Sequence, residues 1–251
     1  MALSLDKIST QAPSLLSLAK TAAHAVDLSG LNGQTAKVAV ALDFSGSMSP
    51  VYGSGAMQRL VEKVLALGTQ FDDDGAIDFF VFDSRAAYLG EIGIGDFAGS
   101  VNRLTKGRHM GTTNYADAFL TIRDHFGFAP PARPKRGFFG LGKAQPSLTI
   151  SADIPVYVLF LTDGAPDNKN AAIQALTEVS TAPIFWKFLS IGRQPMTFLE
   201  QLDTLTQRFV DNANYEPIGD VDSISDALLF KKMLEEFPDW LKEARTKGLI
   251  K

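Results

Sequence analysis

Apolar residues follow two alternating patterns along most of the chain. Short, nearly continuous apolar runs, which are typical of strands buried on both faces, occur at 37–42, 77–82 and 156–161. Between them, apolar residues recur at the three- and four-residue spacing of a helix, most clearly at 56–71 and 115–126. Strands and helices in this order predict an α/β fold, with a mostly parallel central sheet and helices on both of its faces.

Weaker patterns extend this prediction. Residues 88–92 are expected to form a short antiparallel strand at one edge of the sheet, and residues 97–105 and 168–180 are expected to be helices. Further ranges continue the alternation of strands and helices, namely 184–191, 196–202, 206–210 and 224–242.

Two segments stand outside the alternation. Residues 1–36 hold one amphipathic stretch, 14–26, and are predicted to be a helical N-terminal extension. Residues 129–153 concentrate proline, glycine and basic residues between a helix and a strand, which is typical of a long surface excursion. The predicted organisation is therefore an extension followed by one domain over 37–251, which carries a basic, Pro/Gly-rich insertion at about 129–153.

Composition narrows the classes of function. The chain has 251 residues with 45% hydrophobic and 21% charged side chains, which is ordinary globular composition. The formal net charge of -4 gives no support to nucleic-acid binding. The absence of cysteine excludes a disulfide scaffold, a thiol nucleophile and a thiolate metal site. Three histidines far apart in sequence, His24, His109 and His125, do not form a zinc pattern.

The chain also lacks the sequence signals of export and membrane insertion. Its amino terminus has no basic start followed by an apolar core, as a signal peptide requires. No window approaches the ~20 apolar residues that span a bilayer. We therefore expect a cytoplasmic protein.

Polar clusters lie where a ligand site of a doubly wound sheet would be. Asp43-Phe44-Ser45-Gly46-Ser47 directly follows the apolar run 37–42, and Thr162-Asp163-Gly164 ends the run 156–161. A third cluster, Gly111-Thr112-Thr113-Asn114-Tyr115, opens a helix. Because ligands of such sheets bind beyond the carboxyl ends of the strands, the three clusters are expected to meet.

The donor atoms of these clusters predict a cation site. Asp43 and Asp163 supply carboxylates, and Ser45, Ser47 and Thr113 supply neutral hydroxyl oxygens. Such hard donors suit a divalent cation, Mg²⁺ first and Mn²⁺ or Ca²⁺ as alternatives. The set leaves a coordination position open, which a carboxylate of a partner protein could fill.

Each cluster also has a purely structural interpretation. Asp43 and Ser47 could cap the following helix, and Asp163-Gly164 could form a turn. The metal interpretation is favoured because all three clusters occupy the places that a strand-end site requires.

The pattern D-x-S-x-S at 43–47, together with Thr113 and Asp163, resembles the metal-ion-dependent adhesion site (MIDAS) of the von Willebrand factor A (VWA) domain family. The resemblance covers roughly 36–246, and GTTNYADAF and the tail 228–244 are similar to the bacterial tellurium-resistance and copine-like branch.

This resemblance implies a Rossmann-like fold with a cation at the sheet edge. By position, Ser45 and Ser47 would bind the cation directly, and the other three residues directly or through water. Aligning GTTNY with the family favours Thr113 over Thr112.

The favoured function is a non-enzymatic, metal-dependent interaction module that binds a Glu or Asp of a partner protein. Tellurite or general stress resistance is implied by the resemblance alone. One alternative is a metal-dependent phosphohydrolase with Asp43 as nucleophile, but such enzymes need a second acid where this chain has Ser45. The other alternative is a structural domain whose site is never occupied.

Three weaker signals complete the sequence analysis. The spacing G-x-x-x-x-G-K at 137–143 resembles a phosphate-binding loop, but Ala144 replaces the Ser or Thr that would bind magnesium. Membrane contact through the basic residues of 129–153 is less favoured than a solvated loop. Near the end of the chain, Phe237, Pro238 and Trp240 are expected to fix the last helix to the domain, with a docking role as the alternative.

Overall fold

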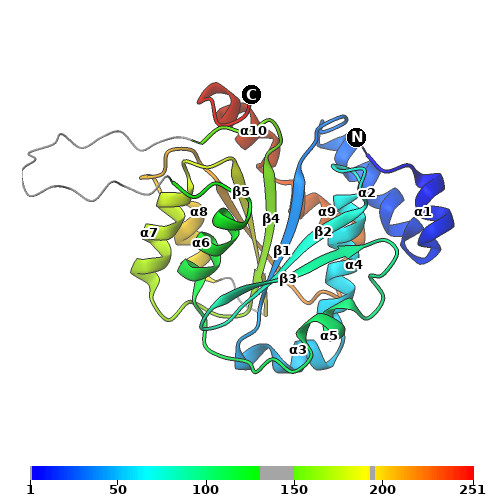
Figure 1. The fold of residues 1–251 in the computed structure, drawn as a ribbon, viewed down its shortest axis with the longest axis horizontal. Helices are drawn as coiled ribbons and strands as arrows, with labels where there is room; N and C mark the ends of the chain where they lie inside the picture. Colours follow the sequence, from blue (N-terminus) through cyan, green and yellow to red (C-terminus); the bar gives the residue numbers. More distant parts are fainter. Residues whose placement is uncertain (1, 131–149, 193–195) are drawn as a thin grey trace, which may run out of the picture.

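A six-stranded sheet forms the centre of the computed structural model, which describes residues 2–130, 150–192 and 196–251 (Figure 1). The strand order is β3-β2-β1-β4-β5-β6, and every neighbouring pair is parallel except β2 and β3. This arrangement confirms the predicted α/β class with one antiparallel edge strand. The strands are β1 (Lys37–Asp43), β2 (Ala76–Phe82), β3 (Ala86–Gly93), β4 (Val156–Thr162), β5 (Ile184–Ile191) and β6 (Ala213–Gly219).

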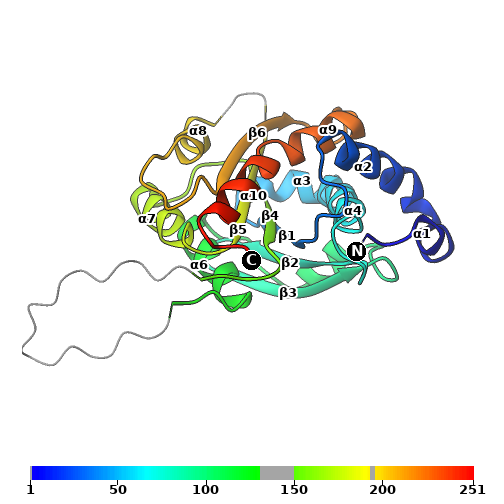
Figure 2. The ribbon, with the colours of Figure 1, turned by 90° about the horizontal axis from the view of Figure 1, so that it is seen from above.

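Helices cover both faces of the sheet (Figure 2). Apolar residues of α2, α4, α9 and α10 pack on one face, and those of α6, α7 and α8 pack on the other. The helices are α1 (Leu5–Gln11), η1 (Pro13–Leu15), α2 (Leu16–Leu28), η2 (Gly46–Met48), α3 (Ser49–Gly53), α4 (Ala56–Gly68), α5 (Ser100–Thr105), α6 (Tyr115–His125), α7 (Lys169–Val179), α8 (Thr197–Asp203), α9 (Asp226–Leu234) and α10 (Phe237–Thr246).

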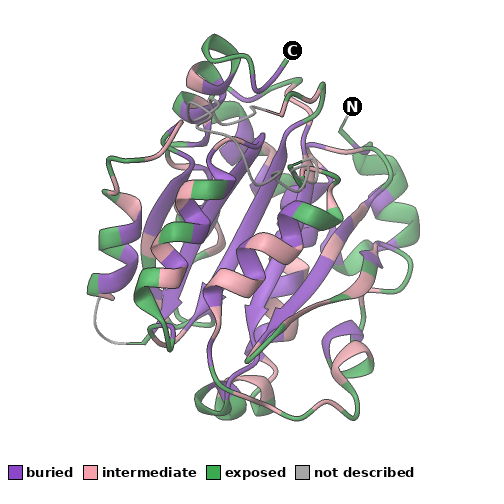
Figure 3. Cartoon of the chain, turned by 60° about the vertical axis from the view of Figure 1, so that its left-hand side comes forward, coloured by how far each residue is buried: buried purple, intermediate pink, exposed green. Residues whose placement is uncertain are grey.

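The central strands are buried on both faces, as their continuous apolar runs predict (Figure 3). All seven residues of β4 are buried. Tyr157 and Leu159 face the helices α2, α4 and α9, whereas Val158 and Phe160 face α6 and α7. The alternation of side chains along a strand thus serves two separate layers of the core.

The carboxyl-terminal third differs from the predicted alternation. Residues 206–210 contain turns instead of a strand, and the last strand is β6, Ala213–Gly219. The range 224–242 is not one helix. The helical conformation is interrupted at Glu235 and Glu236, which separate α9 from α10. Glu236 has a left-handed backbone (φ 65°), which ends the regular helix.

The structure describes nearly all of the predicted N-terminal extension but only the ends of the predicted insertion. Residues 1–36 contribute α1, η1 and α2, and α2 packs against α4 and α9. The predicted insertion at 129–153 lies mostly outside the described residues, since 131–149 are not described, and the same holds for the glycine-rich spacing at 137–143. Among the helices of the described ranges, none combines the length and apolar character that crossing a membrane needs.

A buried lysine lies under the junction of α9 and α10. Lys187 of β5 is fully buried, and its ammonium group donates to Oδ1 of Asn214 and to the carbonyl of Glu235. Burial lowers the pKa of Lys187 to about 8, although the charges of Glu216, Glu235 and Glu236 act in the opposite direction.

This lowered pKa predicts a pH-dependent stability. Between the folded pKa of about 8 and an unfolded value near ~10.4, the unfolded chain binds more protons at Lys187, so the lysine's contribution to stability rises with pH. Relative to Lys187→Met, the wild type should gain on the order of 2 kcal/mol in unfolding free energy from pH 7 to pH 10. Urea unfolding of both proteins at the two pH values measures this difference. A constant difference would mean that Lys187 has an ordinary pKa.

Candidate metal centre

The predicted metal residues gather where the sheet topology changes direction. From β1 the chain moves to β2 on one side, and β4 later pairs with β1 on the other side. Asp43 ends β1 and Thr162 ends β4, with the neighbouring pair Leu42 and Leu161 in register. Asp43 and Asp163 therefore emerge side by side at the crevice where ligands of open α/β sheets bind.

Asp43 forms the buried base of this site. Its side chain is fully buried. Its Oδ1 accepts a hydrogen bond from the amide of Ser45 at 2.8 Å, and its Oδ2 accepts one from the hydroxyl of Thr162 at 2.6 Å. The hydroxyl of Tyr52 donates to the main-chain carbonyl of Asp43 at 3.0 Å. Ser45 and Thr162 thus fix the orientation of the carboxylate, and Tyr52 fixes the main chain that carries it.

Burial raises the pKa of Asp43 to about 6, and the nearby charge of Asp163 adds to the increase. Hydrogen bonds from Thr162 and Ser45 act in the opposite direction. Two close carboxylates, one of them buried, create a negative potential at the crevice. A cation bound between them would relieve the repulsion.

Ser45, Ser47 and Asp163 form a connected row of oxygen atoms above Asp43. Oγ of Ser45 lies 3.1 Å from Oγ of Ser47, which in turn donates to Oδ1 of Asp163 at 2.8 Å. Ser45 is buried, Asp163 is half-buried and Ser47 is exposed. The row therefore leads from the buried carboxylate to the surface, and its outer side is open to a ligand.

The loop before α6 runs directly alongside this row. Gly111 pairs with Ser45, since the amide of Gly46 donates to the Gly111 carbonyl at 3.2 Å. A Cβ at residue 111 would come within 2.7 Å of Oγ of Ser84 and 3.2 Å of the Asp83 side chain, so a larger residue would displace the turn between β2 and β3.

The two threonines that follow Gly111 have different surroundings. Thr113 is buried, and both its amide and its carbonyl bond to Asp167, which lies in the loop after Asp163. The Thr112 hydroxyl, in contrast, is exposed and lies 3.1 Å from Oγ of Ser84. Main-chain atoms thus join Thr113 to the loop that carries Asp163, and the choice of Thr113 as a metal ligand stays a prediction.

Three residues that support the site were missed from the sequence. Thr162 holds Asp43, Asp167 holds Thr113, and the hydroxyl of Tyr115 donates to Oγ1 of Thr162 at 3.1 Å and to the carbonyl of Gly164. Each one lies within or next to a predicted cluster. Their positions indicated proximity, but their hydrogen-bond partners depend on the folded loops.

The oxygen atoms of the site fit a small divalent cation. Neighbouring oxygens around octahedral Mg²⁺ are about 2.9 Å apart, given Mg–O bonds of about 2.0–2.1 Å. The separations of 3.1 Å and 2.8 Å along the row are close to this value. The described ranges hold no group of three or more Asp, Glu or His side chains suited to a metal, so the candidate site relies on hydroxyl oxygens.

Sequence comparisons identify the family. The family model for the VWA domain found in the TerF C terminus matches residues 35–135 and 144–250. The protein YcbR of Bacillus subtilis (strain 168), which is uncharacterised, is 33% identical over 219 residues, covering 86% of this chain and 82% of YcbR.

Solved structures share the fold at low sequence identity. Proximal thread matrix protein 1 from the mussel byssus matches in two crystal forms, with TM-scores of 0.52 and 0.51 and identities of 15% and 14%. These matches cover 80% of this chain but just under half of the mussel protein, 47% and 48% in the two crystal forms. They support the fold alone. The family match over residues 35–135 and 144–250, together with the similarity to YcbR, establishes that the chain belongs to the TerF-like family of von Willebrand factor A domains.

Proposed function

We propose that this VWA domain is a metal-dependent protein-binding module. Asp43, Ser45, Ser47, Thr113 and Asp163 would hold a divalent cation, with Mg²⁺ favoured over Mn²⁺ and Ca²⁺. The bound cation would supply a positive charge with an open coordination position, where a Glu or Asp of a partner protein binds. The observation that carries the proposal is the row of oxygens from Ser45 through Ser47 to Asp163, whose separations octahedral Mg²⁺ accommodates and whose outer side is open.

The surroundings of Asp43 favour binding over catalysis. A nucleophilic carboxylate must reach its substrate, but Asp43 is fully buried and both of its oxygens accept hydrogen bonds. Ser45 occupies the position where a phosphohydrolase of this type needs an acid. We therefore propose a non-enzymatic role. A contribution to bacterial stress or tellurite resistance is part of the proposal only through the TerF-like family.

Capture of partner proteins tests this function. Immobilised wild-type protein, incubated with a lysate of the source cells, should retain one or more proteins in magnesium and release them in chelator. Asp163→Asn should retain none of them, because it removes a charged ligand from the open side of the site. Mass spectrometry of the retained proteins gives the readout.

Asp74→Asn is the matched control. Asp74 is likewise an acidic residue at the surface, but it pairs with Lys37 near the amino ends of the strands, away from the candidate metal centre. This variant should retain the same proteins as the wild type. Retention that is equal in chelator and in magnesium would contradict a metal-dependent role.

A further inference from the structure

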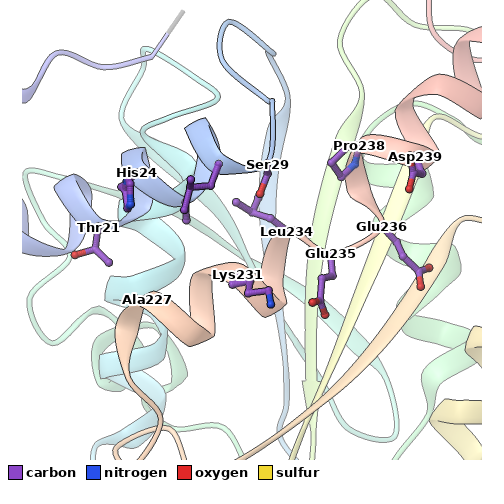
Figure 4. A pocket seen from close by; sticks show the side chains of 12 residues that line it. Thr21, His24, Ser29, Ala227, Lys231, Leu234, Glu235, Glu236, Pro238 and Asp239 are labelled. Carbon is purple, nitrogen blue, oxygen red and sulfur yellow. The ribbon is translucent and has the colours of Figure 1, made fainter.

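A groove lies between the N-terminal extension and the end of the chain (Figure 4). Its volume is about 380 Å³, and its walls come from α2, from α9 and from the start of α10. Because α2 precedes the part of the chain that the family model matches, the groove combines a family element with a segment outside the family match.

Part of the groove lining, here called its floor, is apolar. It comprises Ala25 and Leu28 of α2, Leu234 of α9 and Pro238 of α10. Leu28 is 74% exposed, more than any other large hydrophobic side chain in the described ranges. A large apolar side chain this exposed in the lining of a groove is typical of a binding surface.

The rim of the groove is mainly acidic. Glu235, Glu236 and Asp239 line one end, and a single lysine, Lys231, lies among the lining residues (Figure 4). Among the described residues, the ion pairs within 4.0 Å include none to Glu235 or Glu236, and Asp239 pairs only with the exposed Lys242. The rim therefore presents a negative field beside an apolar floor.

The acidic rim is held by the body of the domain. The carbonyl of Met233, at the end of α9, accepts a hydrogen bond from the buried hydroxyl of Tyr157 at 2.6 Å. Phe237, at the start of α10, is fully buried. Anchors on both sides of Glu235 and Glu236 fix these residues, so the groove is formed before any ligand arrives.

The groove is remote from the candidate metal centre. Tyr157 lies at the amino end of β4, whereas Asp163 follows its carboxyl end. The groove thus lies toward the amino ends of the strands and the candidate metal centre at their carboxyl ends, so a different partner could bind at each.

We propose that this groove binds a short amphipathic helix of a partner protein, with an apolar face flanked by Lys or Arg. Helices form its walls, which suits the packing of a further helix with apolar side chains one turn apart. The basic residues would lie against Glu235, Glu236 and Asp239. A second copy of the chain does not fit, because a twofold contact through this groove would place one acidic rim against the other.

Selection from a display library of short random peptides tests this proposal. The wild-type protein serves as bait in chelator, so that the metal centre cannot contribute. Enriched peptides should have net positive charge and apolar residues at helical spacing. In fluorescence anisotropy, a labelled enriched peptide should bind Leu28→Asp at least tenfold more weakly than wild type.

Leu228→Asp provides the matched control, since Leu228 is also an exposed leucine, on α9 but outside the groove. It should change the affinity less than twofold. Asp239→Lys should weaken binding by reversing one rim charge without touching the apolar floor. Enrichment of acidic peptides, equal binding by Leu28→Asp and wild type, or no enrichment at all would overturn the proposal.

Discussion

In the variant Asp163→Asn, the stabilisation of the fold by Mg²⁺ is expected to disappear. A cation that binds only the folded state stabilises it by about 2.7 kcal/mol at a hundredfold excess over Kd. For a chain of this length that corresponds to an increase in Tm of about 5–10 °C. Asp163 is half-buried and accepts one hydrogen bond, from Ser47, so its amide variant should fold normally. Thermal unfolding in magnesium and in chelator measures the effect.

Without metal, the same substitution is expected to have the opposite effect on stability. Asp43 and Asp163 repel each other when no cation lies between them. Asp163→Asn in chelator should therefore be as stable as the wild type or slightly more stable. Asp74→Asn should keep the full increase in Tm on addition of magnesium, because Asp74 pairs with Lys37 at the amino ends of the strands, far from the candidate metal centre. A wild type that does not respond to any divalent cation would refute the site.

Among the substitutions proposed for this chain, Phe237→Ala is expected to lower the free energy of unfolding most. The Phe237 ring is fully buried between α10 and the sheet, with ring centroids of Tyr157 at 5.1 Å, Phe185 at 5.4 Å and Trp240 at 5.8 Å. Truncating a buried phenylalanine typically costs about 3–5 kcal/mol. Urea unfolding monitored by circular dichroism measures the loss.

Leu228→Ala serves as the comparison, because Leu228 is 46% exposed and should cost less than about 1 kcal/mol. A loss below about 1 kcal/mol for Phe237→Ala would show that the last helix is not fixed by this aromatic cluster. Amide hydrogen exchange in α10 should rise in Phe237→Ala before exchange in β4 does, since the helix loses its anchor first.

The central strands were predictable from sequence because their environment is uniform. In β1, β4 and β5 nearly every residue is buried, so continuous apolar runs mark them without reference to partners. β6 was missed because Asn214, Glu216 and Pro217 interrupt its apolar residues. It forms a sheet edge, where one side of the backbone needs no partner and proline is tolerated.

The boundary between α9 and α10 could not be predicted from hydrophobic periodicity. The apolar residues of 224–242 keep a helical spacing on both sides of the break, so periodicity alone predicts one helix. Glu236 adopts a left-handed backbone without the glycine that usually marks such a position. Pro238, in the first turn of α10, was the available signal of a helix start.

For the candidate site, the residue types and strand ends indicated which clusters would meet, but not how they are held. Asp43 ends β1 and Asp163 follows the adjacent parallel strand β4, so sheet topology alone brings them together. The supporting bonds from Thr162 and Asp167 arise from the conformations of two loops, which carry no periodic signal. Local pattern therefore predicts the donor atoms better than it predicts their orientation.

A crystal structure with Mn²⁺ would test the central claim most directly, because manganese gives an anomalous signal that distinguishes it from water. The account predicts one strong anomalous peak at the carboxyl ends of β1 and β4. Oγ of Ser45 and Oγ of Ser47 should coordinate it directly, and Asp43, Thr113 and Asp163 directly or through water. One position of the coordination shell should be filled by solvent or by a carboxylate of another molecule. No peak at this edge, or a manganese ion bound elsewhere on the chain, would contradict the account.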